Sequence, residues 1–161
     1  MKSTQKIFAL LLLVVSFGSC KKDETKPADT SIASASYAVG DDLQGGIVIF
    51  VDASSQHGLI AATSDQGYHI NWATANANCN SYTTATSVGG WRLPTKTELE
   101  LMMPLKTTIG GFLNLNYWSS TKSTDGTSAW TLYMGTSGGI TSTPWKLLSN
   151  CTVCARAVKE F

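Results

Sequence analysis

The sequence has few charged residues and no cluster of basic ones. Charged side chains make up 14% of the 161 residues, and 12 lysines and arginines nearly balance 11 aspartates and glutamates. No run of lysine or arginine follows Lys22. A protein that binds nucleic acid needs a stripe of positive charge facing the phosphates. We therefore expect no nucleic-acid partner.

Residue patterns for catalysis and metal binding are also scarce. Neither His57 nor His69 is followed four residues later by a histidine or a carboxylate, so the helical zinc-site pattern is absent. The letters of Gly135–Gly139 match a nucleophile elbow, but that motif needs a following helix and a later histidine. Both histidines precede it. The sequence therefore predicts no enzymatic activity, no bound metal and no cofactor.

The longest apolar run lies at the N-terminus and is typical of a targeting segment. Lys2 and Lys6 precede an apolar stretch from Phe8 to Phe17, which is short for a membrane span. The residues Phe17-Gly18-Ser19-Cys20 resemble a lipobox, with small residues before a cysteine. The pattern predicts a lipoprotein signal peptide over residues 1–19. A lipid on Cys20 would then anchor the protein to a membrane.

The segment after Cys20 has the composition of a flexible tether. Lys21-Lys22-Asp23-Glu24 resembles the export signal of Bacteroidota-type lipoproteins, which carries them to the outer face of the outer membrane. Residues 20–44 are rich in small and polar side chains and cannot bury enough surface to offset their ordering entropy. We expect a lipid-anchored, surface-exposed protein with one folded domain over residues 45–161.

The clearest structural signal lies between Gly89 and Met103. Thr95 and Glu98 have the spacing of a capping box at a helix N-terminus. Leu99 and Met102 fall on one face of that helix, and Pro104 ends it. A second helix is predicted from a cap at Asn71 through Cys79. Strands are predicted at 46–51, 59–62, 117–120, 130–134 and 152–158, with a polar loop at 81–90.

The central stretch also resembles a known family. Trp91-Arg92-Leu93-Pro94-Thr95, followed by Glu98-Leu99, is similar to the signature of the domain-of-unknown-function family numbered 1566, named for the C-terminal domain of a collagen-like bacterial adhesin. Further segments agree in order: Gly45 to Phe50, Gln56 to Ala62, Tyr117 to Ser120, Ala129-Trp130 and Ala155 to Lys159. The resemblance implies an α+β, C-type lectin-like fold with a small, mostly antiparallel sheet, two short helices and long loops.

The family resemblance also bears on the cysteines and on ligands. Cys79 matches a family position that often carries a cysteine, but the usual partner position falls at Ala157. Pairing among Cys79, Cys151 and Cys154 is left open. Some family members bind sulfated glycans, and the lack of a basic run here departs from what such binding requires.

The tryptophans suggest where a ligand would bind. Four of them lie in predicted elements and are expected in the core: Trp72, Trp91, Trp118 and Trp130. Trp145 lies in a polar stretch beside Lys146, where an aromatic ring is less expected to be buried. A flat exposed ring among hydrogen-bonding groups is what stacking on a sugar requires.

The resulting prediction is a non-catalytic, lectin-like surface module that binds glycans or mediates adhesion. The resemblance implies a ligand face in the loops before the closing strand. The candidate ligand residues there are Trp145, Lys146, Lys122, Asp125 and Tyr133. The alternative is a structural or protein-interaction lipoprotein that binds no glycan. Expected partners are the membrane, through the N-terminal lipid, and glycans or other surface proteins.

Overall fold

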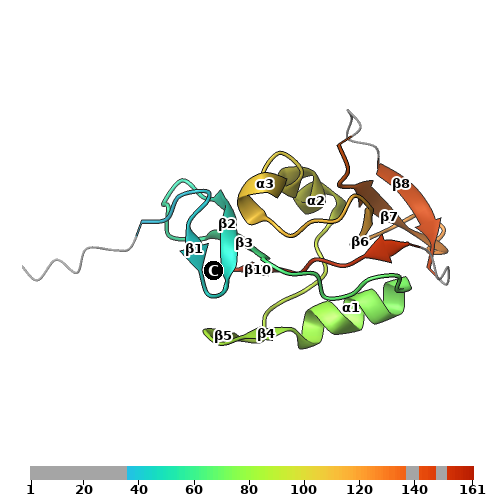
Figure 1. The fold of residues 1–161 in the computed structure, drawn as a ribbon, viewed down its shortest axis with the longest axis horizontal. Helices are drawn as coiled ribbons and strands as arrows, with labels where there is room; N and C mark the ends of the chain where they lie inside the picture. The colour runs from blue at the N-terminus through green and yellow to red at the C-terminus, as the bar shows by residue number, and fades with distance from the viewer. Residues whose placement is uncertain (1–35, 137–141, 148–151) are drawn as a thin grey trace, which may run out of the picture. The chain divides into compact units, whose positions relative to one another are not determined.

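Two four-stranded sheets and a few short helices make up a small mixed α+β domain (Figure 1). The computed structural model describes residues 36–136, 142–147 and 152–161. Within these ranges, no helix is long and apolar enough to cross a membrane. The predicted α+β class is confirmed. The predicted single sheet is wrong, because the apolar runs divide between two sheets and a small hairpin.

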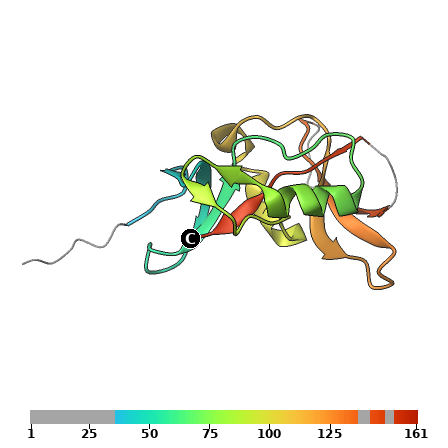
Figure 2. The same ribbon diagram turned by 90° about the horizontal axis from the view of Figure 1, so that it is seen from below.

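The first sheet joins the beginning of the domain to the end of the chain. Its order is β1 (Asp42–Leu43), β2 (Gly46–Val51), β3 (Gly58–Ala62) and β10 (Val158–Glu160), with antiparallel pairing throughout. The strands predicted at 46–51 and 59–62 are confirmed, and both come from apolar runs. Figure 2 shows the C-terminus beside this sheet, where β10 pairs with β3.

Strand β1 lies inside the segment predicted as a tether. Asp42 pairs with Ile47, and the amide of Gly40 donates to the carbonyl of Val48 at 2.8 Å. The folded part of the chain therefore begins before the predicted boundary at residue 44. This short, polar edge strand has no apolar run that would reveal it in the sequence.

The second sheet has the order β8 (Ser142–Lys146), β7 (Ser128–Tyr133), β6 (Asn116–Lys122) and β9 (Val153–Cys154), with β9 parallel to β6. The strands predicted around Tyr117 and Trp130 are confirmed, but buried and exposed residues do not alternate along β7 as they would in a half-buried strand. Thr131 is buried and Trp130 is only half-buried. Both faces of this sheet are covered, so simple alternation fails.

The predicted closing strand 152–158 is split in two. Val153–Cys154 belong to the second sheet, and Val158–Glu160 belong to the first. The residues between them are buried, and the backbone of Ala155 forms a bridge with Gly67. The chain thus passes from one sheet to the other. An apolar run gives no sign of such a change of sheet.

The helices begin where their capping residues predict. The side chain of Asn71 accepts from the amide of Thr74 and starts α1 (Trp72–Ser81). Thr95 and Glu98 form both bonds of a capping box at the start of α2 (Lys96–Met102). A third helix, α3 (Lys106–Ile109), follows Pro104 and was not predicted. The predicted polar loop 81–90 contains a hairpin of β4 (Thr83–Thr84) and β5 (Ser87–Val88).

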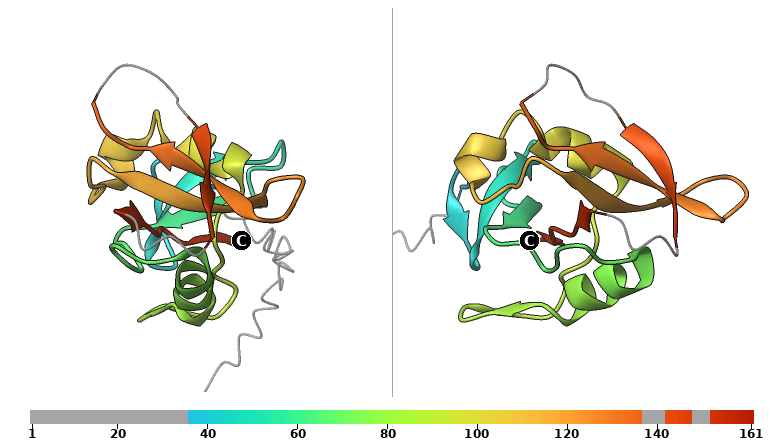
Figure 3. Two further views of the ribbon diagram at one scale, coloured as in Figure 1. Left: turned by 90° about the vertical axis from the view of Figure 1, so that its right-hand side faces the viewer. Right: turned by 45° about the vertical axis from the view of Figure 1, so that its right-hand side comes forward.

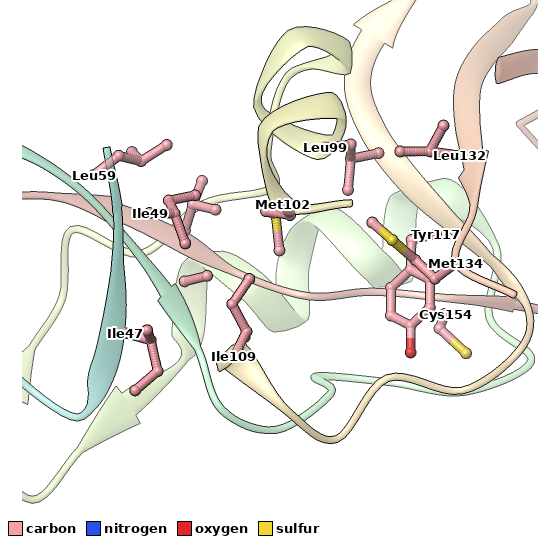
Figure 4. Close-up of a cluster of buried hydrophobic side chains, with 12 residues drawn as sticks. Ile47, Ile49, Leu59, Leu99, Met102, Ile109, Tyr117, Leu132, Met134 and Cys154 are labelled. Carbon is pink, nitrogen blue, oxygen red and sulfur yellow. The ribbon is translucent and has the colours of Figure 1, made fainter. Parts of the chain in front are cut away.

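Helices α1 and α2 pack on opposite faces of the second sheet (Figure 3). Leu99 and Met102 of α2 belong to one buried cluster with Tyr117 and Leu132 (Figure 4). On the other face, Cys79 of α1 belongs to a second cluster, which contains Ala75, Trp118, Ala129 and Val153. Trp91 and Trp118 are buried as predicted, whereas Trp72 and Trp130 are half-buried.

A fully buried arginine ties the segment after β3 to the loop after α3. Arg156 donates from Nε to Asp65 Oδ1 at 2.7 Å. Its terminal nitrogens donate to three backbone carbonyls, those of Ala62, Gly110 and Gly111. The hydroxyl of Tyr117 donates to the other oxygen of Asp65 at 2.8 Å. The charge is therefore buried with partners on every side, which offsets its desolvation.

Candidate functional site

The predicted ligand residues all lie on or beside the second sheet. Lys122 is exposed at the end of β6, and its Nζ lies 4.5 Å from the ring centroid of Trp72. Asp125 lies in the turn after β6 and accepts from the hydroxyls of Ser123 and Thr127 at 2.6 and 2.8 Å. The hydrogen bond from Ser123 is the main reason that the pKa of Asp125 is lowered. These side chains are already engaged within the domain.

Trp145 and Lys146 lie at the same end of the second sheet as Lys122, because Ala129 of β7 pairs with both Lys122 and Trp145, whereas Tyr133 does not lie there. Trp145 packs, half-buried, against the cluster beneath α1. The backbone of Lys146 pairs with Ser128 at the same end of β7. Tyr133 lies at the other end of β7, five residues from Ser128 and about 17 Å away at the usual rise of a strand.

The thiols that the structure describes are buried and unreactive. Cys79 and Cys154 are both free, and burial raises their pKa values to about 12 and about 11. A thiol with a raised pKa carries little thiolate and is a poor nucleophile or metal ligand. Among the described residues, no three His, Cys, Asp or Glu side chains come together in a way that would hold a metal. Cys20 and Cys151 lie outside the described residues, as does Ser137, the serine of the Gly135–Gly139 pattern.

A groove of about 530 Å³ lies between α2 and the end of the first sheet. Its apolar lining comes from Phe50, Leu59, Leu101 and Phe161. Its polar lining comes from Asp52, His57, Glu98 and Glu160. This volume lies within the range of pockets that hold small ligands. Two of the apolar side chains are conspicuously exposed, Phe50 at 48% and Leu101 at 39%.

Backbone irregularity places Phe50 in the groove. The register of β2 against β3 shifts between Val48 and Phe50, as at a β-bulge. A bulge interrupts the alternation of a strand and re-aims the side chain beside it. Val48 and Ile49 are both buried, whereas Phe50, two residues after Val48, is exposed, so the alternation is interrupted at the register shift. An aromatic ring at the end of a buried strand is thereby presented to solvent.

The C-terminal residue forms the opposite wall and is held in place. The backbones of Phe161 and Gly58 exchange two hydrogen bonds, at 3.1 and 3.2 Å. A Cβ on residue 58 would clash with the carbonyl oxygen of Phe50 and lie 2.9 Å from the Phe161 ring, so only glycine fits at this position. The ring of Tyr37 packs edge-on against Phe161, with centroids 5.1 Å apart. The groove wall is therefore preformed.

Helix α2 contributes a charged and an apolar side chain to the same wall. Glu98 and Leu101 are three residues apart and so share one face of the helix. Arg92 donates to both oxygens of Glu98, at 2.7 and 2.8 Å, and to Glu160 at 2.9 Å. Burial alone would raise the pKa of Glu98, but the bonds from Arg92 and Thr95 outweigh it and lower the pKa. The same bonds, that from Glu98 first, raise the pKa of Arg92.

Asp52 begins the turn between β2 and β3 and is ionised for a different reason. Its Oδ1 accepts from the amide and the hydroxyl of Ser54, at 3.0 and 2.6 Å. The hydroxyl bond is the main cause of its lowered pKa. The backbone amide of Asp52 donates to the carbonyl of His57 at 2.8 Å and closes the turn. The groove can therefore offer fixed carboxylates beside apolar side chains.

The sequence alone did not indicate this groove. Its residues come from the turn 52–58, helix α2 and the chain end, which lie far apart in the sequence. His57 lacks the spacing of a helical zinc site, and its sequence neighbours do not connect it with α2 or with residues 160–161. The available signal was the large apolar Phe50 and Leu101 next to acidic residues, and that pattern is also typical of ordinary surfaces.

Comparison with known proteins adds no assignment to this geometry. No family model matches the chain, and no curated protein matches it at a significant level. The resemblance of the Trp91 to Leu99 stretch to a known domain family stays a prediction, and the function must be argued from the site itself.

Proposed function

We propose that this chain is a lipid-anchored surface protein whose lectin-like domain binds glycans in the groove without catalysing a reaction. The observation that carries the proposal is the exposure of Phe50 and Leu101 beside fixed carboxylates in one preformed groove. A sugar ring has apolar C–H faces and a rim of hydroxyl groups. Aromatic and aliphatic side chains cover the first, and carboxylate oxygens accept hydrogen bonds from the second.

The charges in the groove support binding over catalysis. Glycoside hydrolysis needs a carboxylic acid whose pKa is raised so that it can donate a proton. The pKa values of Asp52 and Glu98 are lowered instead. The groove lining includes no serine, threonine, cysteine or lysine that could act as a nucleophile. Carboxylates that stay ionised suit a role as hydrogen-bond acceptors.

A lectin-like fold and a surface location complete the proposal. The α+β class, the two capped helices around a sheet and the sequence resemblance support the lectin-like fold. The location rests on residues 1–24, which the structure does not describe. If Cys20 carries the lipid, Cys20→Ala should abolish incorporation of labelled palmitate. Equal labelling of both proteins would exclude this anchor.

A glycan array tests the central part of the proposal. The full chain, purified in mild detergent, should bind a subset of glycans, and Phe50→Ala should remove that binding. Val88→Ala is the matched control, because Val88 is 87% exposed on the β4–β5 hairpin and lies outside the groove. Both variants should keep the melting temperature of the parent. Binding that survives Phe50→Ala would exclude the groove as the site.

A structural or protein-interaction role without glycan binding is the second candidate. Phe50 and Leu101 are also the kind of exposed apolar side chains that protein interfaces bury. A blank array from a correctly folded chain would favour this role and reject the first.

A further inference from the structure

The groove carries more negative than positive charge. Three carboxylates line it, those of Asp52, Glu98 and Glu160. Arg92 is bonded to the last two and offsets one of their charges. Asp52 receives its side-chain hydrogen bonds from Ser54, which is neutral. His57 is the other titratable group in the lining. An anionic ligand is therefore disfavoured here, and a cationic one is favoured.

One carboxylate oxygen is placed to take up a cationic group. Both bonds from Ser54 go to Oδ1 of Asp52. No described side chain donates a hydrogen bond to Oδ2 of Asp52, but the backbone amide of His57 lies close enough to the carboxylate to lower its pKa. Asp52 follows Phe50 by two residues and lines the same groove. An apolar ring and an available anionic oxygen therefore lie on the same wall.

The backbone of the groove walls does not suit capture of an extended peptide. Peptides often bind by adding a strand to a free sheet edge. At β10, Val158 already exchanges two backbone hydrogen bonds with Arg92, each 2.9 Å long. The backbones of Gly58 and Phe161 are likewise paired with one another. The groove instead offers side chains, which suits a ligand recognised through its ring face and its substituents.

We propose that the ligand of this groove is a glycan that bears a protonated amine, with its ring face on Phe50 and its amine beside Asp52. This inference rests on the proposed glycan-binding function and names the class of sugar. Hydroxyl groups of the same ring would donate to Glu160, which is largely exposed at the rim. A single sugar binds weakly in such an open site, and several copies on a surface would add avidity.

Two matched oligosaccharides test the inference. Glucosamine oligomers carry protonated amines, and N-acetylglucosamine oligomers of the same length have the same rings and linkages without the charge. Calorimetric titration of the full chain in detergent, at neutral pH, should show tighter binding of the charged oligomer. The preference should shrink at high salt, because screening weakens an exposed ion pair.

Two aspartate variants assign the effect to the groove. Asp52→Asn keeps an acceptor for Ser54 but removes the charge, and it should weaken binding of the glucosamine oligomer about two- to fivefold. Binding of the acetylated oligomer should not change. Asp125→Asn is the matched control, because Asp125 holds a similar serine-bonded turn outside the groove. It should leave both affinities unchanged.

The possible failures are distinguishable. Equal binding of the two oligomers would overturn the inference about the amine while leaving glycan binding intact. An equal loss in Asp52→Asn and Asp125→Asn would overturn it as well, because the effect would then be one of net charge. Binding of neither oligomer, together with binding of an oligolysine peptide that depends on Asp52, would overturn the glycan function itself.

Discussion

Two arginine clusters in this domain use similar chemistry in opposite surroundings. Arg156 is completely buried and meets Asp65, whose side chain is 16% exposed. Arg92 has a side chain that is 34% exposed and bridges Glu98 and Glu160, at 18% and 77%. Both form hydrogen-bonded ion pairs of 2.7 Å at their shortest. The two clusters therefore differ in how deeply the arginine is buried and not in their bond lengths.

The difference indicates what each cluster is for. Removal of one partner from a buried ion pair leaves an uncompensated charge and costs about 3–5 kcal/mol. An exposed pair contributes about 0–1 kcal/mol, because water solvates both partners. The Arg156 cluster therefore holds the segment after β3 and the loop at Gly110 and Gly111 together. The Arg92 cluster mainly sets the charge and shape of the groove.

The largest predicted effect comes from breaking the buried cluster. Arg156→Ala should lower the free energy of unfolding by about 3–5 kcal/mol, because Asp65 and three backbone carbonyls lose their donor. Urea denaturation followed by tryptophan fluorescence measures this. Arg156→Lys keeps the charge but loses the forked geometry, so its loss should be smaller. A loss below about 1 kcal/mol for the alanine variant would show that the Arg156 cluster stabilises the fold no more than an exposed ion pair does.

The helix cap beside Arg92 should have an intermediate effect. The Thr95 hydroxyl accepts from the amide of Glu98, and the Glu98 carboxylate accepts from the amide of Thr95. Thr95→Ala should cost about 1 kcal/mol through the lost cap. Thr95→Ser retains the hydroxyl and should restore most of this stability in the same urea experiment. If serine restores nothing, the methyl group and its packing matter more than the cap.

Breaking the exposed cluster should change stability least. Arg92→Ala should cost less than Arg156→Ala, because Glu160 stays solvated and Glu98 keeps its bond from the Thr95 amide, although Glu98 itself is only 18% exposed. The same substitution increases the negative charge of the groove and should strengthen binding of a glucosamine oligomer. Thermal unfolding and calorimetric titration report the two effects separately. A large loss of stability with weaker binding would show that Arg92 supports the fold as Arg156 does.

The exposed cluster should also appear in the dependence of stability on pH. The pKa of Glu98 is lower in the folded chain than its ordinary value of 4.5. A carboxyl with a lowered pKa stabilises the fold above its unfolded pKa, and this contribution is lost as the pH falls through the folded pKa. The urea midpoint should therefore fall as the pH drops below about 4.5. In Glu98→Gln this fall should be smaller, and an unchanged profile would show that Glu98 is not coupled to folding.

The sequence predicted local structure well where the signal is local. The cap at Asn71, the box of Thr95 and Glu98 and the strands at 46–51 and 59–62 were all predicted, because each depends on neighbours along the chain. The division into two sheets was not predicted. It depends on where the chain crosses at residues 155–157, and the apolar stretch from Val153 to Val158, interrupted only by Arg156, does not reveal that crossing.

The sites depend on contacts over long sequence separations. The sequence around Arg156 does not indicate its partner, because Asp65 lies 91 residues away along the chain. The groove combines Phe50, Leu101 and Phe161, which no spacing rule connects. Trp145 was expected to be exposed because its sequence neighbours are polar. It is half-buried because β8 pairs with β7 and its ring packs beneath α1, and sequence neighbours do not report these contacts.

The most direct test of the account is to map the bound glycan on the domain by NMR. Amide and methyl shifts of the full chain in detergent should be followed during titration with a glucosamine oligomer. We expect the chemical shifts of Phe50, His57, Leu101 and Phe161 to change, and those of Lys122 and Trp145 to stay the same. Shift changes confined to Lys122 and Trp145 would show that the glycan binds at the second sheet, which would contradict binding in the groove.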